Sequence, residues 1–322
     1  MNANSTAIDW LLEDNEPSIK YRTLTELLDY KAESSAVAKA KATIAKSPRV
    51  LALFSGQNAD GGFGIHPYDK WMGAHWRLAC LADLALPDGD KRALKAMNTV
   101  FAWLTSNDHR KYIKDINGLT RRCASQEGNA LFSACRLGMA DDPRCEFLAD
   151  SIISWQWPDG GWNCDKHKEA HHSSFHESTL PTQGLIAYYR ATGHRKSQIV
   201  AQKAGEMLLR HKLFKAESND KVIHPNWLKL YYPSYWHYNI LQGLTTMVML
   251  GKINDPRTTE ALDILDRLRR PDGKWRASGS HWKSSEAAGR YRSPVDWWKG
   301  KPNKMLTLQS LIVLKAAKRW KP

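Results

Sequence analysis

One polar segment, residues 164–177, concentrates the side chains of this chain that could do chemistry. It follows a PDGGW turn at residues 158–162 and precedes an apolar helical segment. Cysteine, histidine and aspartate are the donors of zinc sites, and histidines and carboxylates also act as general acids and bases. The segment therefore predicts a zinc site or a metal-free acid/base site, unless its side chains only form hydrogen bonds and cap a helix. Its candidate groups are Cys164, Asp165, His167, His171, His172, His176 and Glu177.

Zinc is the only cofactor that these residue types suggest. The ligands that we consider are Cys164, His171 and His172, together with His237 from a later segment.

A second candidate segment, residues 121–127, leads into another apolar helix. Arg121 or Arg122 could hold an anion, and Glu127 could act as an acid or base. Cys123 could be a thiolate, because neighbouring arginines and a helix N-terminus lower a thiol pKa. The alternative is that these charges only pair with the helix dipole or lie on the surface.

A third segment, residues 224–238, is dense in aromatic side chains and contains His237. Ring faces suit an apolar or cationic ligand, or they stack on sugars. The alternative is that a long loop packs its rings onto the protein. As substrate-binding residues we consider Trp71, His75, Trp227, Tyr232, Trp236, Tyr238 and Trp297, beside Arg121 and Arg122.

The composition limits the classes of protein that fit. The 322 residues are 42% hydrophobic and 25% charged, as in an ordinary globular protein, and no apolar run reaches the roughly 18 residues of a membrane helix. The N-terminus has no signal-peptide pattern, so we expect a cytoplasmic protein. A net charge of +14 permits an anionic small-molecule partner, whereas no nucleic-acid motif is present. Five cysteines argue against a disulfide framework, and the oligomeric state is not predicted.

The helices that position these segments can be predicted from the spacing of apolar residues along the chain. Six segments are apolar on most sides, which indicates buried helices, and they alternate with six that have a charged face. The pattern predicts an all-α fold, an (α/α)6 barrel or toroid of six inner and six outer helices in one domain, 1–322. The inner helices are expected at 17–29, 72–86, 126–138, 178–192, 237–250 and 304–319, and the outer ones at 4–13, 35–54, 90–105, 143–156, 196–213 and 256–269.

The connectors indicate where a site would lie. Parallel inner helices would place all their N-termini at one end, and the connectors that enter them are the long, polar and aromatic ones. Long loops on a rigid scaffold carry function, and helix N-termini favour anions. We therefore expect a cavity that opens at this N-terminal rim.

The turns carry a family resemblance. QNADGGF at 57–63, QWPDGGW at 156–162 and RPDGKW at 270–275 repeat one pattern. The stretch SWQWPDGGW resembles the QW-type repeat of the terpenoid cyclase and protein prenyltransferase superfamily, which implies an α/α toroid. This chain lacks the Asp-x-Asp-Asp acid motif of class II cyclases. The Asp-x-Cys zinc positions of prenyltransferases fall at His171 and Ser173, while their later histidine resembles His237.

The resemblance implies an enzyme similar to terpenoid cyclases or prenyltransferases. It would act on an isoprenoid-like or other apolar-anionic substrate in a cavity lined by tryptophan and histidine, with or without a metal. Two alternatives are a carbohydrate-active (α/α)6 hydrolase or lyase, with Glu127 or Glu177 as acid/base, and a non-catalytic binding toroid. The predicted catalytic groups are Asp165, His172, His176, Glu177, Glu127 and His237.

Overall fold

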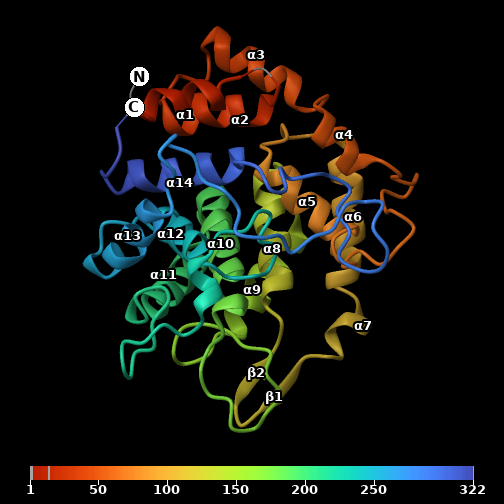
Figure 1. The fold of residues 1–322 in the computed structure, drawn as a ribbon. Helices are drawn as coiled ribbons and strands as arrows, with labels where there is room; N and C mark the ends of the chain where they lie inside the picture. Colours follow the sequence, from red (N-terminus) through yellow and green to blue (C-terminus); the bar gives the residue numbers. More distant parts are fainter. Residues whose placement is uncertain (1–2, 14, 322) are drawn as a thin grey trace.

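The structure is a computed structural model that describes residues 3–13 and 15–321, and within these ranges it is mostly helical (Figure 1). The strands of the described part form one short antiparallel hairpin, β1 (Lys114–Ile116) and β2 (Leu119–Arg121). The predicted all-α class is thus confirmed. None of the described helices combines the length and the apolar character that crossing a bilayer requires.

Six helical segments follow one another around the interior of the molecule. They are α2 (Pro17–Arg22) with its π-helical continuation η1 (Thr23–Leu27), α5 (Ala74–Asp83), α8 (Ser125–Arg136), α10 (Phe175–Thr192), α12 (Ile240–Met249) and α14 (Lys304–Ala316). From α5 to α14 each helix packs against the next in this order, and α14 returns to α2 and η1. A hydrogen bond shows that the neighbouring helices α8 and α10 run parallel. The backbone N–H of Ser125, at the start of α8, donates to the carboxylate of Glu177, at the start of α10.

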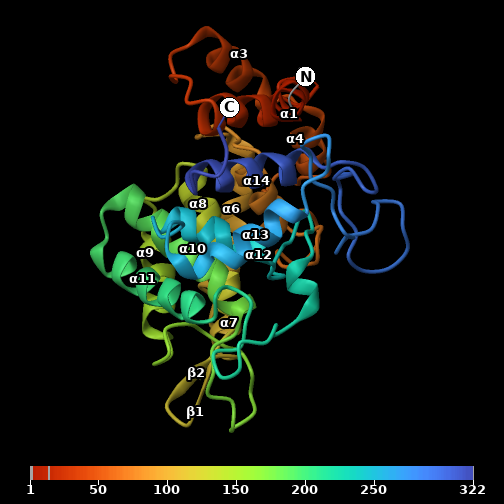
Figure 2. The same cartoon turned by 60° about the vertical axis from the view of Figure 1, so that its left-hand side comes forward.

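The remaining helices pack outside these six segments (Figures 1 and 2). They are α1 (Ala3–Leu11), α3 (Ser35–Ile44), α4 (Pro48–Phe54), α6 (Lys91–Leu104), α9 (Pro143–Ser154), α11 (Arg195–Arg210) and α13 (Thr259–Arg267), with a short α7 (Asn107–Arg110) after α6. Each outer helix buries one stripe, as α9 buries Cys145, Leu148 and Ile152 at helical spacing. The main apolar core includes residues from Ala7 to Trp320, and a small second cluster is formed by Leu24, Val37 and Ala40.

The boundaries differ from the prediction at two prolines. The expected helix 35–54 is two helices, because Pro48 has no N–H to continue α3 and instead occupies the first turn of α4. The expected helix 178–192 begins earlier, at Phe175, and contains Pro181. The helix expected from residue 237 begins at Ile240, where the side chain of Asn239 accepts the backbone N–H of Gln242.

The three Asp-Gly turns share one hydrogen-bonding pattern. In each turn, the backbone N–H of the residue two positions before the aspartate donates to the carbonyl four residues later. These hydrogen bonds run from Asn58 to Gly62, from Trp157 to Gly161 and from Arg270 to Lys274. The turns are therefore structurally equivalent.

A glutamine fastens each of the first two turns to the following outer helix. Gln57 donates to the carbonyl of Arg92 in α6, and Gln156 donates to that of Val200 in α11. Gly61 has a φ of +93°, and a Cβ there would lie 2.4 Å from the carbonyl oxygen of Lys95. Glycine is thus required for the turn to approach the helix so closely.

Candidate functional site

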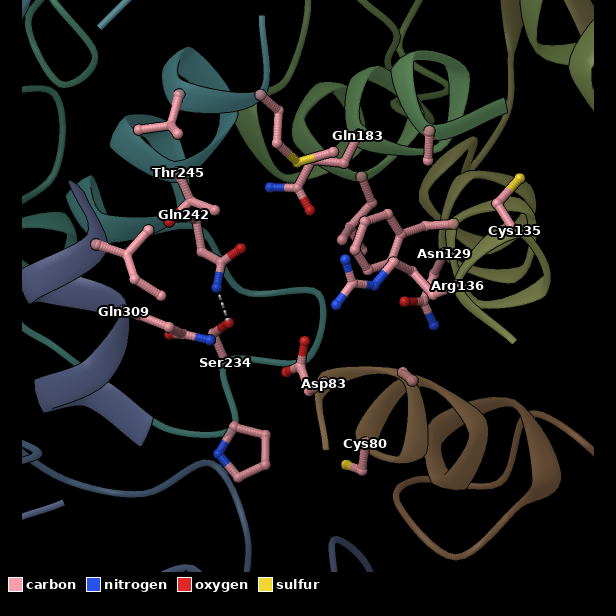
Figure 3. A pocket seen from close by; sticks show the side chains of 18 of the residues that line it. Cys80, Asp83, Asn129, Cys135, Arg136, Gln183, Ser234, Gln242, Thr245 and Gln309 are labelled. Carbon is pink, nitrogen blue, oxygen red and sulfur yellow. Dashed lines mark hydrogen bonds between the residues drawn. The ribbon is translucent and has the colours of Figure 1, made fainter. Parts of the chain in front are cut away.

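A central cavity of about 540 Å³ lies between the six inner segments. All six contribute side chains to it, as does the loop segment 233–235 before α12 (Figure 3). Its apolar lining includes Trp76, Phe132, Leu180, Tyr235, Met249 and Val313. Its polar lining includes Arg22, Glu26, Asp83, Asn129, Arg136, Gln183, Arg190, Gln242, Thr245 and Gln309.

The cavity extends from the first turns of α5 and α12, at Trp76 and Gln242, to the C-terminal ends of the inner helices, and its exposed lining lies at that end and not at the predicted N-terminal rim. Arg136 and Arg190 line it from the last turns of α8 and α10, and both are exposed. At the opposite end the loop residue Tyr235 closes the cavity by stacking on Trp71 with ring centroids 3.8 Å apart. The expected opening was wrong because the long connectors fold inward and fill the N-terminal end.

Asp83 is the acidic group of this cavity with the most unusual environment. It stands at the end of α5 and points into the cavity together with Gln183 and Gln242 (Figure 3). Burial raises the pKa of Asp83 above its ordinary value, although Arg22, Arg136 and the hydroxyl of Tyr232 act in the opposite direction. The Tyr232 hydroxyl lies 3.4 Å from its Oδ2. A carboxyl can act as a general acid, and a raised pKa keeps it protonated to a higher pH than an ordinary aspartate.

The arginines of the cavity differ in how far they are neutralised. Arg22 is buried and forms a two-point ion pair with Glu26, with N–O distances of 2.7 and 2.9 Å. Arg190 donates to the carbonyl of Met249. Arg136 makes no hydrogen bond or contact ion pair with any described residue, and its charge acts on the carboxyls of Asp83 and Glu26, so its N–H groups are available to an anion.

None of the site residues predicted from the sequence lines this cavity. Most of the predicted aromatic binding residues are instead packed in the core or closely around it. Trp71 and Trp297 are 1% exposed, and their indole N–H groups donate to the His281 carbonyl and to the Ser293 hydroxyl. Tyr238 donates its hydroxyl to the carbonyl of Leu213. These partners satisfy the polar ends of the rings, which leaves the faces for packing.

The other predicted aromatic and histidine residues at this end contact one another. Trp227 packs on Phe175, and Trp236 stacks on His237 with centroids 3.9 Å apart. His237 also stacks on His281, and burial together with this neighbour lowers the pKa of His237 to about 3.

Two predicted residues do reach side chains of the cavity. The hydroxyl of Tyr232 contacts Asp83, and the Nε2 of His75 lies 2.9 Å from the Nδ2 of Asn129. His75 is 1% exposed, and burial lowers its pKa to about 3, so it is neutral at physiological pH.

The two arginines predicted to hold an anion are occupied by other contacts: Arg122 pairs with a carboxylate, and Arg121 stacks on a tryptophan ring. Arg122 is buried against Glu127, 2.6 Å away, and also contacts His109. Burial opposes ionisation of Glu127, but the hydrogen bond from His109 and the charge of Arg122 outweigh it and lower the pKa of Glu127. Arg121 lies over the ring of Trp157 at 4.5 Å. These contacts connect α7, the hairpin and α8.

Replacing Glu127 by glutamine is expected to destabilise the fold by about 3 kcal/mol, because the buried Arg122 would lose its counter-charge. Urea denaturation measures this change. The matched control is Asp108→Asn, which removes an exposed ion pair with Lys111 and is expected to have no measurable effect. Equal stability of the two variants would contradict a structural role for this ion pair.

The polar segment 164–177 is divided between surface and interior. Asp165 and His167 are exposed and pair with each other at 2.7 Å. His171 and His172 are also exposed, and their rings touch with centroids 4.0 Å apart. His176 instead accepts the backbone N–H of Tyr238 at its Nδ1, and burial is the main cause that lowers its pKa.

Among the described residues, the side chains that lie close enough together to bind a metal ion are not the set that the sequence predicted. Cys164 lies with Cys123 and Glu177, and the three ligand atoms are all within 4.8 Å of one another. The predicted ligands His171, His172 and His237 do not belong to this group. His171 and His172 turn outward on the surface loop, and His237 is held in its aromatic stack.

The comparisons with known proteins add a structural likeness without a family assignment. No family model matches the chain, and no curated protein matches its sequence significantly. Two similar solved structures are of the type II terpene cyclase MstE from Scytonema. The apo enzyme has a TM-score of 0.45 and 16% identity, and covers 99% of this chain and 98% of its own. An alanine variant in complex with its product, merosterolic acid A, has a TM-score of 0.46 and 16% identity over 99% and 97%.

Proposed function

We propose that this chain is a single-domain α/α toroid whose central cavity binds an apolar small molecule with an anionic group and transforms it by proton transfer. The observation that carries this proposal is Asp83, a carboxyl with a raised pKa inside a cavity that apolar, amide and other charged side chains line. An isoprenoid-like compound belongs to the proposed substrate class.

The shape and walls of the cavity support a small-molecule ligand. A volume of about 540 Å³ lies in the range of roughly 300–1,000 Å³ that ligand pockets occupy. Trp76, Phe132 and Tyr235 present aromatic rings beside Leu180 and Val313. Such walls favour an apolar body.

The same walls favour a positively charged intermediate. Ring faces attract a cation, and the C-terminal ends of the inner helices carry partial negative charge. If the Asp83 carboxyl gives its proton to a carbon–carbon double bond, a carbocation and a carboxylate form together. Loss of a proton from the rearranged cation to a base would complete an isomerisation or cyclisation without any other reagent.

Arg136 supports the anionic part of the ligand. It lies at the exposed end of the cavity and makes no hydrogen bond or contact ion pair with a described residue, although its charge acts on the carboxyls of Asp83 and Glu26. A carboxylate or phosphate held there by the guanidinium would direct the apolar part of the molecule inward, toward Asp83.

Carbohydrate hydrolysis is less well supported by the same residues. It ordinarily requires two available carboxyl groups. Glu26 also lines the cavity, but Arg22 holds both of its oxygens, so only Asp83 is available.

Ligand binding by three probes tests the proposal. We expect an isoprenoid carboxylate to bind and to be converted, whereas a saturated fatty acid of equal length binds unchanged and a linear oligosaccharide does not bind. Calorimetry measures binding, and mass spectrometry detects conversion. Ala79→Trp, which fills the cavity, should abolish binding, while Leu51→Trp, on the 50% exposed Leu51, should leave it unchanged.

The outcomes separate the alternatives. Binding of the isoprenoid without conversion would leave a binding protein, and binding of the oligosaccharide alone would favour a carbohydrate-active enzyme. Binding that Ala79→Trp does not affect would place the ligand outside this cavity.

A further inference from the structure

Three connectors bring two thiols and one carboxylate together at the N-terminal end of the inner helices. Cys123 lies just before α8, Cys164 follows the turn at 158–162, and Glu177 is in the first turn of α10. Their ligand atoms are all within 4.8 Å of one another, and Cys164 Sγ is 3.7 Å from Glu177 Oε1. Ligands of a tetrahedral zinc ion are separated by roughly 3.5–4 Å, given zinc–ligand bonds of about 2.0–2.3 Å. The group needs little adjustment to reach this geometry.

The backbone fixes the two cysteines beside each other. Arg121 and Asn163 form a parallel bridge, and the backbone N–H of Arg122 donates to the Asn163 carbonyl at 3.1 Å. The segments that end in Cys123 and Cys164 therefore run side by side in fixed register. The donor positions do not depend on the exposed loop 165–172.

Glu177 is oriented by a partner outside the group. Its Oε2 accepts the backbone N–H of Ser125 at 3.0 Å, which leaves Oε1 to face the thiol of Cys164. Hydrogen bonds of this kind hold metal-binding carboxylates in position.

Within the described part of the chain, the buried carboxylate of Glu177 forms no ion pair with a cationic side chain. Glu177 is 9% exposed, and no lysine, arginine or histidine of the described residues pairs with it at contact distance. Burial accordingly raises its pKa. A buried carboxylate is normally paired with a cation or coordinates a metal, and here the neighbouring groups that could complete such a site are thiols.

We propose that Cys123, Cys164 and Glu177 bind one Zn²⁺ ion through two sulfur atoms and one carboxylate oxygen, with the fourth position open to water or an added ligand. Two thiolates select zinc over magnesium or calcium, and three protein ligands with one open position is the arrangement of catalytic zinc sites. The site does not depend on the function proposed for the central cavity, since none of its residues lines that cavity.

Metal titration of the reduced, chelator-treated full chain tests the site. We expect Co²⁺ to bind at one equivalent with a thiolate-to-cobalt charge-transfer band, and Zn²⁺ to displace it. Cys123→Ser, Cys164→Ser and Glu177→Gln should each weaken metal binding by at least about 100-fold. The matched controls His171→Ala, His237→Ala and Cys135→Ser should keep full binding and the same spectrum.

Alkylation of the unsubstituted chain avoids variants that fail to fold. Zinc should protect Cys123 and Cys164 from the reagent and leave the rate at the partly exposed Cys135 unchanged. Three results would overturn the proposal: no uptake at one equivalent, loss of binding in the histidine variants instead, or a Cys123–Cys164 disulfide whose reduction creates no metal site.

Discussion

Replacing Asp83 by asparagine is expected to lower turnover of the converted probe by at least about 100-fold, the usual contribution of a general acid. Asparagine keeps the size of the side chain and its contact with Tyr232 but has no proton to give. Ligand affinity should therefore stay within a few-fold, which calorimetry measures. A matched control is Asp88→Asn, an exposed aspartate just beyond α5, which should retain full activity.

The pH dependence of Asp83 provides a second measurement. Only the protonated carboxyl is an acid, so turnover should fall as the pH rises through the raised folded-state pKa.

The pH dependence of the free energy of unfolding tests the environment of Asp83 without a substrate. Because the folded state raises this pKa, the contribution of the group to stability is complete below its unfolded pKa and is lost as the pH rises through the folded value. The stability of the unsubstituted chain should thus decline relative to Asp83→Asn across that window. Parallel stability curves together with unchanged turnover would remove Asp83 from the mechanism.

The alternation of helices could be predicted from the sequence because burial is expressed in local periodicity. α9 shows one apolar stripe beside a charged face, whereas α10 has no charged residue between Glu177 and Arg190, and the structure places them outside and inside accordingly. The turns were also recognisable, because the first glycine of each Asp-Gly-Gly has a positive φ, +93° at Gly61 and +110° at Gly160, which is a local requirement for glycine. The break at Pro48 could have been predicted from the missing N–H alone.

The cavity could not be predicted in this way. In the sequence, Asp83 is an acidic residue at a helix end, and nothing nearby distinguishes it from a surface carboxylate. Arg136 in the last turn of α8 fits an ordinary pairing with the helix dipole. Their significance depends on which helices lie opposite them, and that information is spread over the whole chain.

The density of aromatic residues was ambiguous for a related reason. Trp71, Tyr235 and His237 have the composition of a ligand-binding wall, but each meets another ring of the same loops. Composition indicates that rings are available, whereas only the tertiary structure decides whether a ligand or another ring covers them. Cys123 and Cys164 are 41 positions apart in the sequence (164 − 123 = 41), so their proximity likewise depends on the pairing of Arg121 with Asn163.

Gly184→Ala is expected to destabilise the fold by forcing apart two closely packed inner helices. α8 and α10 approach so closely at Gly128 and Gly184 that a Cβ on Gly184 would lie 2.5 Å from the carbonyl oxygen of Gly128. Overpacking costs about 1–3 kcal/mol and occasionally more, and the clash here is with backbone that cannot rotate away. Alanine returns at most about 1 kcal/mol of helix propensity. We therefore expect a net loss of about 2 kcal/mol or more, measured by urea denaturation. Gly128→Ala should behave in the same way, since its Cβ would lie 2.4 Å from the backbone nitrogen of Pro181.

Gly205→Ala in α11 is the matched control for this close approach. Its added Cβ would lie 2.4 Å from Leu250 Cδ1, the end of a flexible side chain that can move, so the change should stay within about 1 kcal/mol.

The two kinds of variant should also differ at the cavity. Asn129 and Gln183 line it from positions next to Gly128 and Gly184, so forcing α8 and α10 apart changes the distance between these amides. Gly184→Ala should thus weaken probe binding while Gly205→Ala does not. If both variants were equally stable and bound the probe equally well, the close contact of α8 and α10 would be neither a requirement of the fold nor a determinant of the cavity.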